Sequence, residues 1–249
     1  MTNASRHPIE VDGLRREFGS FVAVRDVSFH VERGEIFGYL GANGAGKSTT
    51  IRMLCGLLAP SGGRATVAGH DIARSPHAVK ASIGYMSQRF SLYLDLDAQD
   101  NLEFFGGIYG LRRKQLRAAI DEVVERTALS EYRHALTSSL PGGIRQRLAL
   151  ACAIMHKPEI IFLDEPTAGV DPISRRHFWR LIRDAASAGT TIFVTTHYMD
   201  EAEYCDRISI MVDGRIAALG TPGELKTQFA APSIDDVFVR LARPGAAKS

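Results

Sequence analysis

Polar and apolar residues alternate along the first 40 residues, as they do in β-strands that bury one face. The alternation is clearest between residues 22 and 31, where the apolar positions are Val22, Val24, Val27, Phe29 and Val31. Glycine-containing breaks at 18–20 and 32–35 interrupt the pattern and predict turns. The apolar run at 36–40 then predicts a buried strand.

The spacing becomes helical between about residues 97 and 156. Apolar residues recur there at helical intervals, at Leu116, Ala119, Ile120, Val123, Val124 and Leu129. Strands return at 160–163 and 192–195, separated by a predicted helix that starts at Asp171-Pro172. This alternation predicts an α/β core with a parallel sheet and an inserted helical subdomain.

Shorter signals add further elements. A helix is expected from about 47 to 58, and strands at 65–68 and 83–86. Asp213-Gly214 predicts a tight hairpin turn between 208–212 and 215–219. Helices are also expected to start at Thr221-Pro222 and at Ser233, and residues 243–249 to form a frayed tail.

Composition narrows the class of protein. The 249 residues are 45% hydrophobic and 23% charged, with a formal net charge of +2. These values exclude a disordered chain and a nucleic-acid binder driven by bulk charge, although they allow a local basic face. No nucleic-acid partner is expected. No stretch approaches the ~18 apolar residues of a membrane-spanning helix, and we find no secretory signal at the N-terminus.

Cysteines and histidines offer little sign of metal or disulfide chemistry. The three cysteines, Cys55, Cys152 and Cys205, include no CxxC pair. We expect them to be reduced and packed as small apolar residues, which favours a cytosolic compartment. The eight histidines include no HExxH or HxH pair, so the sequence disfavours a histidine-based metal site.

A glycine-rich segment between the buried strand and the first helix carries the strongest chemical signal. It matches GxxxxGK[ST], the P-loop pattern, and consists of Gly41, Ala42, Asn43, Gly44, Ala45, Gly46, Lys47, Ser48 and Thr49. Its glycines let consecutive backbone N–H groups surround an anion, and the helix N-terminus adds a positive dipole end. Lys47 is expected to reach the β- and γ-phosphates of ATP, and Ser48 to bind Mg²⁺.

Two carboxylates follow the strand at 160–163. Asp164 is the expected Mg²⁺ partner, which leaves Glu165 to polarise an attacking water. A strand that ends in Asp-Glu is also common surface chemistry, and a lone histidine after a strand, such as His197, is usually structural. Both signals gain weight because ligand sites lie at the carboxyl ends of parallel strands.

Other P-loop classes fit less well. A regulatory GTPase should carry an NKxD motif, and the sequence has none. Nothing in the sequence identifies the lid or acceptor site of a small-molecule kinase.

The chain resembles the ATP-binding cassette family over about residues 8–240. Residues 140–148, LPGGIRQRL, resemble the family signature LSGGQxQR. Gln88 matches the family's Q-loop, residues 166–171 match its D-loop, and His197 matches its switch histidine. Phe18 stands where the family places an aromatic residue that stacks on adenine.

The resemblance implies a single ABC ATPase domain of the α/β class. It consists of a P-loop NTPase core with a mixed sheet (1–88 and 157–220), an N-terminal antiparallel β-subdomain within that core, a helical subdomain with the signature (89–156), and C-terminal helices with a tail (221–249). Two such domains pair head to tail, as a homodimer or a heterodimer. Each ATP is then held between the P-loop of one domain and the signature and D-loop of the other, at Leu140, Pro141, Gly142, Gly143 and Asp171.

The same resemblance implies roles for the catalytic residues. Glu165 acts as general base, and His197 holds the γ-phosphate. Gln88 senses both Mg²⁺ and the membrane partner, and Ser48, Gln88 and Asp164 are the expected metal-binding residues. ATP binding closes the dimer, and hydrolysis reopens it.

The signature departs from the family pattern at two positions. Pro141 replaces the serine that contacts the γ-phosphate across the dimer, and Ile144 replaces the following glutamine. Proline has neither a hydroxyl nor an N–H to donate. A lost charge-assisted hydrogen bond of about 1.5–3 kcal/mol would weaken closure roughly ten- to a hundredfold, unless a heterodimer partner supplies an intact signature.

The amino-acid sequences of several segments resemble those of the drug-exporter subgroup of bacterial cassette ATPases. Only 51 residues separate Gln88 from Leu140, which disfavours the coiled-coil chromosome-maintenance members, and the 52 residues after His197 disfavour the sugar importers. The resemblance therefore implies an exporter subunit at the cytoplasmic face of the membrane. The partners that it implies are a separate permease and a periplasmic adaptor. The alternatives are a non-transport cassette, regulatory or linked to nucleic acid, and a chain that binds ATP as a switch without turnover.

Overall fold

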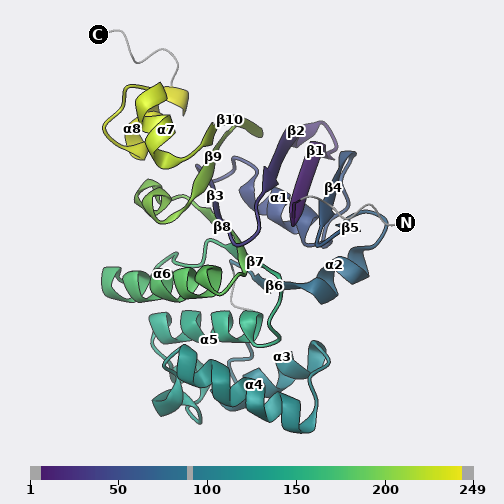
Figure 1. The fold of residues 1–249 in the computed structure, drawn as a ribbon, viewed down its shortest axis with the longest axis vertical. Helices are drawn as coiled ribbons and strands as arrows, with labels where there is room; N and C mark the ends of the chain where they lie inside the picture. The colour runs from purple at the N-terminus through teal and green to yellow at the C-terminus, as the bar shows by residue number, and fades with distance from the viewer. Residues whose placement is uncertain (1–6, 89–91, 243–249) are drawn as a thin grey trace.

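The computed structural model describes residues 7–88 and 92–242 of the chain. Figure 1 shows a small N-terminal sheet beside a larger sheet, with a helical lobe below them. The N-terminal sheet is antiparallel and has the strand order β2-β1-β4-β5. Its strands are β1 (Ile9–Phe18), β2 (Phe21–Val31), β4 (Gly62–Val67) and β5 (His70–Asp71).

The larger sheet is mixed and has the strand order β10-β9-β3-β8-β7-β6. Only β10 runs antiparallel to its neighbour within this sheet. Its strands are β3 (Ile36–Gly41), β6 (Ile83–Met86), β7 (Ile160–Asp164), β8 (Thr191–Thr196), β9 (Arg207–Val212) and β10 (Arg215–Gly220). β3, β7 and β8 are buried along their whole length, which accounts for their continuous apolar sequences.

Two hydrophobic cores lie on the two faces of the mixed sheet. Helix α1 (Lys47–Leu54) packs between the two sheets, where Ile51 shares a core with Phe37 of β3 and Val27 of β2. The opposite face is covered by α5 (Gly142–Ile154) and α6 (Pro172–Ser187), whose side chains pack against Leu40 and Leu163. Alternate residues of one strand thus serve different cores.

The helical lobe contains α3 (Ala98–Ile108), α4 (Arg113–Arg126) and α5, with the short 3₁₀ helices η1 (Ser130–Tyr132) and η2 (Thr137–Ser139). The other helical elements are α2 (Pro76–Ser82), η3 (Met199–Tyr204), α7 (Pro222–Gln228) and α8 (Ile234–Ala242). Across the described ranges, no helix combines the length and the apolar character that crossing a membrane requires.

The α/β fold class with its mixed sheet is confirmed, and so are the local helix starts. The Asp171 carboxylate accepts hydrogen bonds from two backbone N–H groups of α6, and Thr221 forms a capping box with Glu224 at α7. Ser233 caps α8 by accepting from the Asp236 N–H. The hairpin turn at Asp213-Gly214 joins β9 to β10.

The predicted end of the first helix is wrong. The sequence pattern extended it to residue 58, whereas α1 ends at Leu54. Gly56 adopts a left-handed φ of 66°, and a Cβ there would lie 3.1 Å from Pro76, so close packing against α2 turns the chain. The three cysteines are free and buried, and the predicted tail lies outside the described residues.

Candidate nucleotide site

The P-loop joins β3 to α1, as the sequence predicts. Gly44 and Gly46 have left-handed φ values of 82° and 104°. A Cβ on residue 46 would lie 2.4 Å from the Ala23 carbonyl oxygen, so only glycine fits there. No side chain caps α1 at this glycine, and its first turn has no acidic residue. The helix therefore starts with uncapped N–H groups, the arrangement that binds phosphate.

Lys47 is buried and lies folded against its own loop. Its Nζ donates to the carbonyl oxygens of Gly41 and Ala42, at 2.9 and 3.1 Å, and lies 3.2 Å from Glu165 Oε1. The ammonium is only 3% exposed, and the Glu165 side chain only 5%. A positive charge is therefore held beside the uncapped start of α1, where an anion would gain from both.

Ser48 and Asp164 meet at the end of β7. The Ser48 hydroxyl donates to Asp164 Oδ1 at 3.1 Å, and Thr195 Oγ1 on β8 donates to the same oxygen at 2.7 Å. Burial raises the pKa of Asp164, and these two hydrogen bonds oppose the rise. A buried carboxylate oxygen next to a hydroxyl oxygen is the hard donor set that Mg²⁺ prefers, so these residues fit the ion.

Three groups converge on the carboxylate of Glu165. Oε2 lies 3.0 Å from Gln88 Nε2 and 3.0 Å from His197 Nδ1, and Oε1 lies 3.2 Å from the Lys47 ammonium. Because a carboxylate only accepts, the contact with His197 requires a proton on Nδ1. The backbone of Glu165 has φ 49°, an unusual value for a side-chain-bearing residue, and its N–H donates to the Thr195 carbonyl and hydroxyl.

The structure thus brings together most of the catalytic residues that the sequence singles out. Gln88 contacts Glu165 through its amide nitrogen, whereas Ser48 and Asp164 contact each other. Thr195 was missed by sequence reasoning. Its signal is a polar residue near the end of the apolar strand β8, where it is fully buried. It ties both carboxylate residues to β8.

The signature lies near the end of the D-loop at Asp171, whereas the start of the D-loop adjoins Glu165, whose carbonyl accepts from the Ala168 N–H. A Cβ on Gly143 would lie 2.6 Å from Ser174 Oγ, so the start of α5 packs on the first turn of α6 behind Asp171. Pro141 stands at the N-cap of α5 and makes no side-chain cap, whereas Ile144 is buried. In the described part of the chain, no hydrogen bond or ion pair links 140–143 or Asp171 to the P-loop.

Phe18 also lies apart from the carboxylates. It ends β1, is 46% exposed, and has the Arg16 guanidinium 4.5 Å from its ring centroid. An exposed ring with a cation on one face is suited to stacking.

A second buried contact was also missed by sequence reasoning. Thr167, just after Glu165, donates to Glu201 Oε1 at 2.6 Å, and Arg175 Nε lies 3.6 Å from the same oxygen. Glu201 is fully buried in η3. This contact anchors the D-loop segment to the end of the mixed sheet, and its only sequence signal is an acidic residue within a helical turn.

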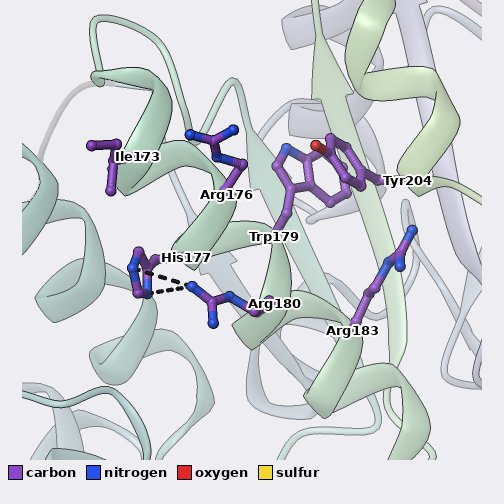
Figure 2. A pocket seen from close by; sticks show the side chains of 7 residues that line it. All are labelled: Ile173, Arg176, His177, Trp179, Arg180, Arg183 and Tyr204. Atoms are coloured by element: carbon purple, nitrogen blue, oxygen red, sulfur yellow. Dashed lines mark hydrogen bonds between the residues drawn. The ribbon is translucent and has the colours of Figure 1, made fainter.

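A separate hollow of about 300 Å³ lies along α6 (Figure 2). Arg176, Arg180 and Arg183 line it, together with Trp179, whose ring stacks on Tyr204 with centroids 5.0 Å apart. It shares no residue with the P-loop or with the Glu165 cluster. The candidate nucleotide site is therefore defined by its residues and not by this hollow.

The fold and the P-loop cluster define a nucleotide-binding α/β protein, and comparison with known families agrees. The family model described as "ABC transporter" matches residues 24–168, and a model described as "AAA domain, putative AbiEii toxin, Type IV TA system" matches the shorter segment 142–199. The first match covers more than half of the chain. The chain therefore belongs to the ABC transporter family and is an ATP-binding domain of it.

Individual relatives place the chain within that family. It is 49% identical over 238 residues to a "Probable multidrug ABC transporter ATP-binding protein YbhF" of Escherichia coli (strain K12), covering 94% of this chain and 41% of the relative. It is 40% identical to the "Daunorubicin resistance ATP-binding protein DrrA3" of Streptomyces coeruleorubidus, covering 96% of this chain and 76% of the relative. The chain thus spans about two fifths of the first relative's length.

A solved structure gives the same result for the fold. The "Structure of ATP binding subunit of ABC transporter" superposes with a TM-score of 0.84 at 28% identity, covering 94% of this chain and 98% of that one.

Proposed function

We propose that this chain binds MgATP and hydrolyses it as the ATP-binding subunit of an exporter. The observation that carries the proposal is the Glu165 carboxylate, held by Gln88, His197 and Lys47 at the end of β7. It stands beside the Ser48–Asp164 pair, which would hold Mg²⁺. The site thus combines a phosphate cradle, a metal-binding pair and a positioned base.

The residues of the site have different roles in ATP hydrolysis. Glu165 accepts a proton as water attacks the γ-phosphorus, and the start of α1 and Lys47 offset the charge on the phosphate oxygens. Mg²⁺, when bound, would neutralise part of that charge. Incoming phosphates compete with Glu165 for the Lys47 ammonium. Binding of ATP therefore frees Glu165 Oε1 to face the water.

We propose that a complete site needs two chains. The signature starts α5 and Asp171 caps α6, and among the described residues no hydrogen bond or ion pair links them to the P-loop of the same chain. Head-to-tail pairing would bring the N–H groups of Gly142 and Gly143 of one chain to the ATP on the other. The N–H of these two glycines has no partner in the described part of the chain, which leaves them free for a phosphate.

The membrane subunit is proposed to dock where α3 meets the segment after Gln88. Exposed apolar side chains collect there: Tyr93 (44% exposed), Leu94 (46%), Phe104 (42%) and Ile108 (62%). The rings of Tyr93 and Phe104 meet edge to face with centroids 4.7 Å apart. A patch of this kind marks a protein interface. This docking would hold the chain at the cytoplasmic face of the membrane.

The export direction and the drug-like substrate are proposed from the relatives. The names of the two relatives described above refer to multidrug transport and daunorubicin resistance. These names favour an exporter over a non-transport cassette. A periplasmic adaptor remains a prediction of the sequence resemblance alone.

The hydrolysis proposal is tested with the Glu165→Gln variant. Gln keeps the size and the hydrogen bonding of the side chain but cannot accept a proton. We expect phosphate release at saturating MgATP to fall about 10²- to 10⁴-fold, with ATP affinity retained. Glu203→Gln, on the surface of η3, is the matched control and should leave turnover unchanged. Equal turnover in the Glu165→Gln and wild-type proteins would show that the chain binds ATP without using this base.

The docking proposal has its own test. The chain is purified from detergent extract after co-expression with any membrane protein of about six spans that proves to be encoded beside it. Phe104→Ser with Ile108→Ser should abolish co-purification, whereas Ile173→Ser, an equally exposed apolar residue at 64%, should not. Recovery of ribosomes or DNA with no membrane protein would instead support the non-transport alternative.

A further inference from the structure

The outer face of the N-terminal sheet carries a polar groove of about 570 Å³ that is unrelated to the nucleotide site. Polar residues of β1, β2 and β4 line it, because the strand register places Glu10 opposite both His30 and Thr66. His7, which precedes β1, lies at one end of the groove. The segment 7–32 thus brings two histidines and two glutamates to one surface.

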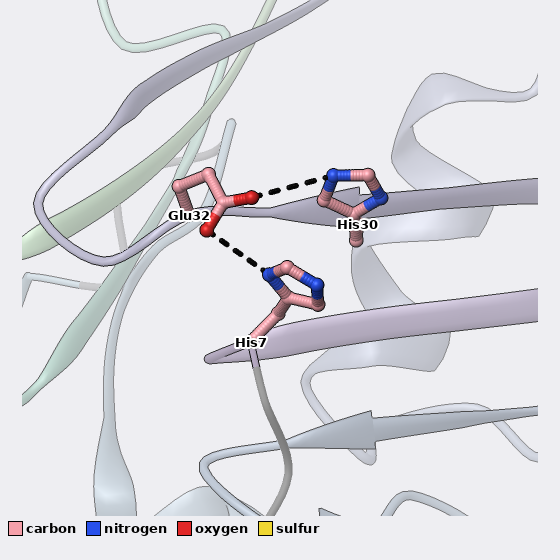
Figure 3. Close-up of side chains that lie close together, drawn as sticks. All are labelled: His7, His30 and Glu32. Carbon is pink, nitrogen blue, oxygen red and sulfur yellow. Dashed lines mark hydrogen bonds and ion pairs between the residues drawn. The ribbon is translucent and has the colours of Figure 1, made fainter.

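Three of these groups form a tight cluster (Figure 3). Glu32 Oε2 lies 3.0 Å from His7 Nδ1, and Glu32 Oε1 lies 3.4 Å from His30 Nε2. The two imidazole rings stack with centroids 4.3 Å apart. One ligand atom from each residue lies within 4.8 Å of the other two. Two ring nitrogens and the Glu32 carboxylate therefore lie close enough together to share one ion.

These separations suit a transition-metal ion. Bonds of about 2.0–2.1 Å to nitrogen and oxygen place neighbouring ligand atoms of a four-coordinate ion roughly 3.3 Å apart, and each imidazole nitrogen lies 3.0 or 3.4 Å from one of the two Glu32 oxygens. Two histidines with one carboxylate form a known ligand set for zinc. Mg²⁺ and Ca²⁺ prefer oxygen ligands and do not suit it.

We propose that His7, His30 and Glu32 bind a divalent transition-metal ion, with Zn²⁺ as the best match. Glu32 and His30 are 53% and 47% exposed, so water completes the coordination. The ion joins the start of β1 to the end of β2, and it stabilises the sheet that carries Phe18. Sequence spacing could not show this site, because His7 is far from the His30-x-Glu32 pair along the chain.

The test uses the full chain without a polyhistidine tag, after chelation and without nucleotide. Titration calorimetry with ZnCl₂ is expected to show one ion per chain, with a Kd of about 10 μM or tighter. His30→Ala and Glu32→Gln should each weaken binding at least about tenfold. His134→Ala is the matched control, since it removes an exposed histidine that lies 3.8 Å from a single carboxylate, that of Asp97.

Two further measurements guard against a variant that fails to fold. Co²⁺ in place of Zn²⁺ should give the visible absorption of a four-coordinate ion in the wild-type and His134→Ala proteins only. Zn²⁺ at about 100 times Kd should raise Tm by roughly 5–10 °C, an increase that Glu32→Gln loses while keeping the metal-free Tm. The proposal is overturned if no ion binds at about 100 μM Zn²⁺, or if His30→Ala and Glu32→Gln bind as tightly as wild type.

Discussion

The P-loop and the signature both place glycine-rich backbone at the start of a helix, α1 in one case and α5 in the other. Around the first, Lys47 contacts Glu165 and Ser48 contacts Asp164. Around the second, Pro141 offers no cap, and the neighbouring α6 supplies only packing. The P-loop end is organised within one chain, whereas we propose that the signature end becomes functional only against a second one.

The glycines of the two ends give the strongest test of this difference. Gly46→Ala places a Cβ 2.4 Å from the Ala23 carbonyl oxygen, at a residue whose φ is 104°. We expect ATP affinity to fall at least about a hundredfold and the free energy of unfolding to fall by at least about 1–3 kcal/mol. Gly142→Ala at the start of α5 meets open space and should leave the free energy of unfolding within about 0.5 kcal/mol.

Nucleotide binding and urea unfolding of both variants measure these effects. Comparable loss of ATP affinity and stability in the two variants would contradict the contrast between the two ends.

The prediction that Pro141 weakens closure of the ATP-bound dimer is tested by replacing this proline with serine. Pro141→Ser supplies a hydroxyl at the N-cap of α5, where it can cap the helix and donate to a γ-phosphate across the dimer. We expect ATP turnover at saturating ATP to rise about ten- to a hundredfold, which corresponds to the 1.5–3 kcal/mol of a charge-assisted hydrogen bond. Pro141→Ala is the control, because it restores the N–H without the hydroxyl. Unchanged turnover in Pro141→Ser would show that this position does not limit closure.

A smaller effect, on the pH dependence of stability, is expected at the contact between the helical lobe and the mixed sheet. His156, just after α5, has Nε2 3.1 Å from the Ile83 carbonyl and stacks on Tyr109 at 3.5 Å. Burial lowers its pKa to about 4, so the folded state holds the neutral ring and the unfolded state takes up the proton near 6.5.

Stability from this group is therefore present above pH 6.5 and is lost as the pH falls toward 4. At pH 5 the loss should be up to about 2 kcal/mol, measured by urea unfolding at pH 7.5 and 5. His156→Phe should flatten this dependence. An equally steep fall in that variant would assign the effect to other groups.

The P-loop and the residues around Glu165 could not be predicted from the sequence to the same extent. The P-loop was predictable because its chemistry is local: a buried strand, glycines and a helix start follow one another, and Lys47 lies inside the motif. The convergence of Gln88 and His197 on Glu165 came from family resemblance, since these residues are far apart along the chain and meet only through the order of β6, β7 and β8.

Contacts set by register or packing could not be predicted. Thr195 is one of several polar residues in β8, and only its pairing opposite Asp164 shows its part in the site. The end of α1 at Leu54 depends on packing against Pro76, and no local sequence pattern indicates this contact. The His7–His30–Glu32 cluster depends on how β1 lies on β2.

The central claim is that a working ATP site combines the P-loop of one chain with the signature of another. It is tested most directly by the molar mass of the Glu165→Gln protein in saturating MgATP, measured by light scattering after gel filtration. We expect a species with twice the 27.2 kDa mass of the chain. This species should revert to monomer when ATP is removed or when the Lys47→Ala substitution is added. A Glu165→Gln chain that is loaded with ATP and remains a monomer would contradict it.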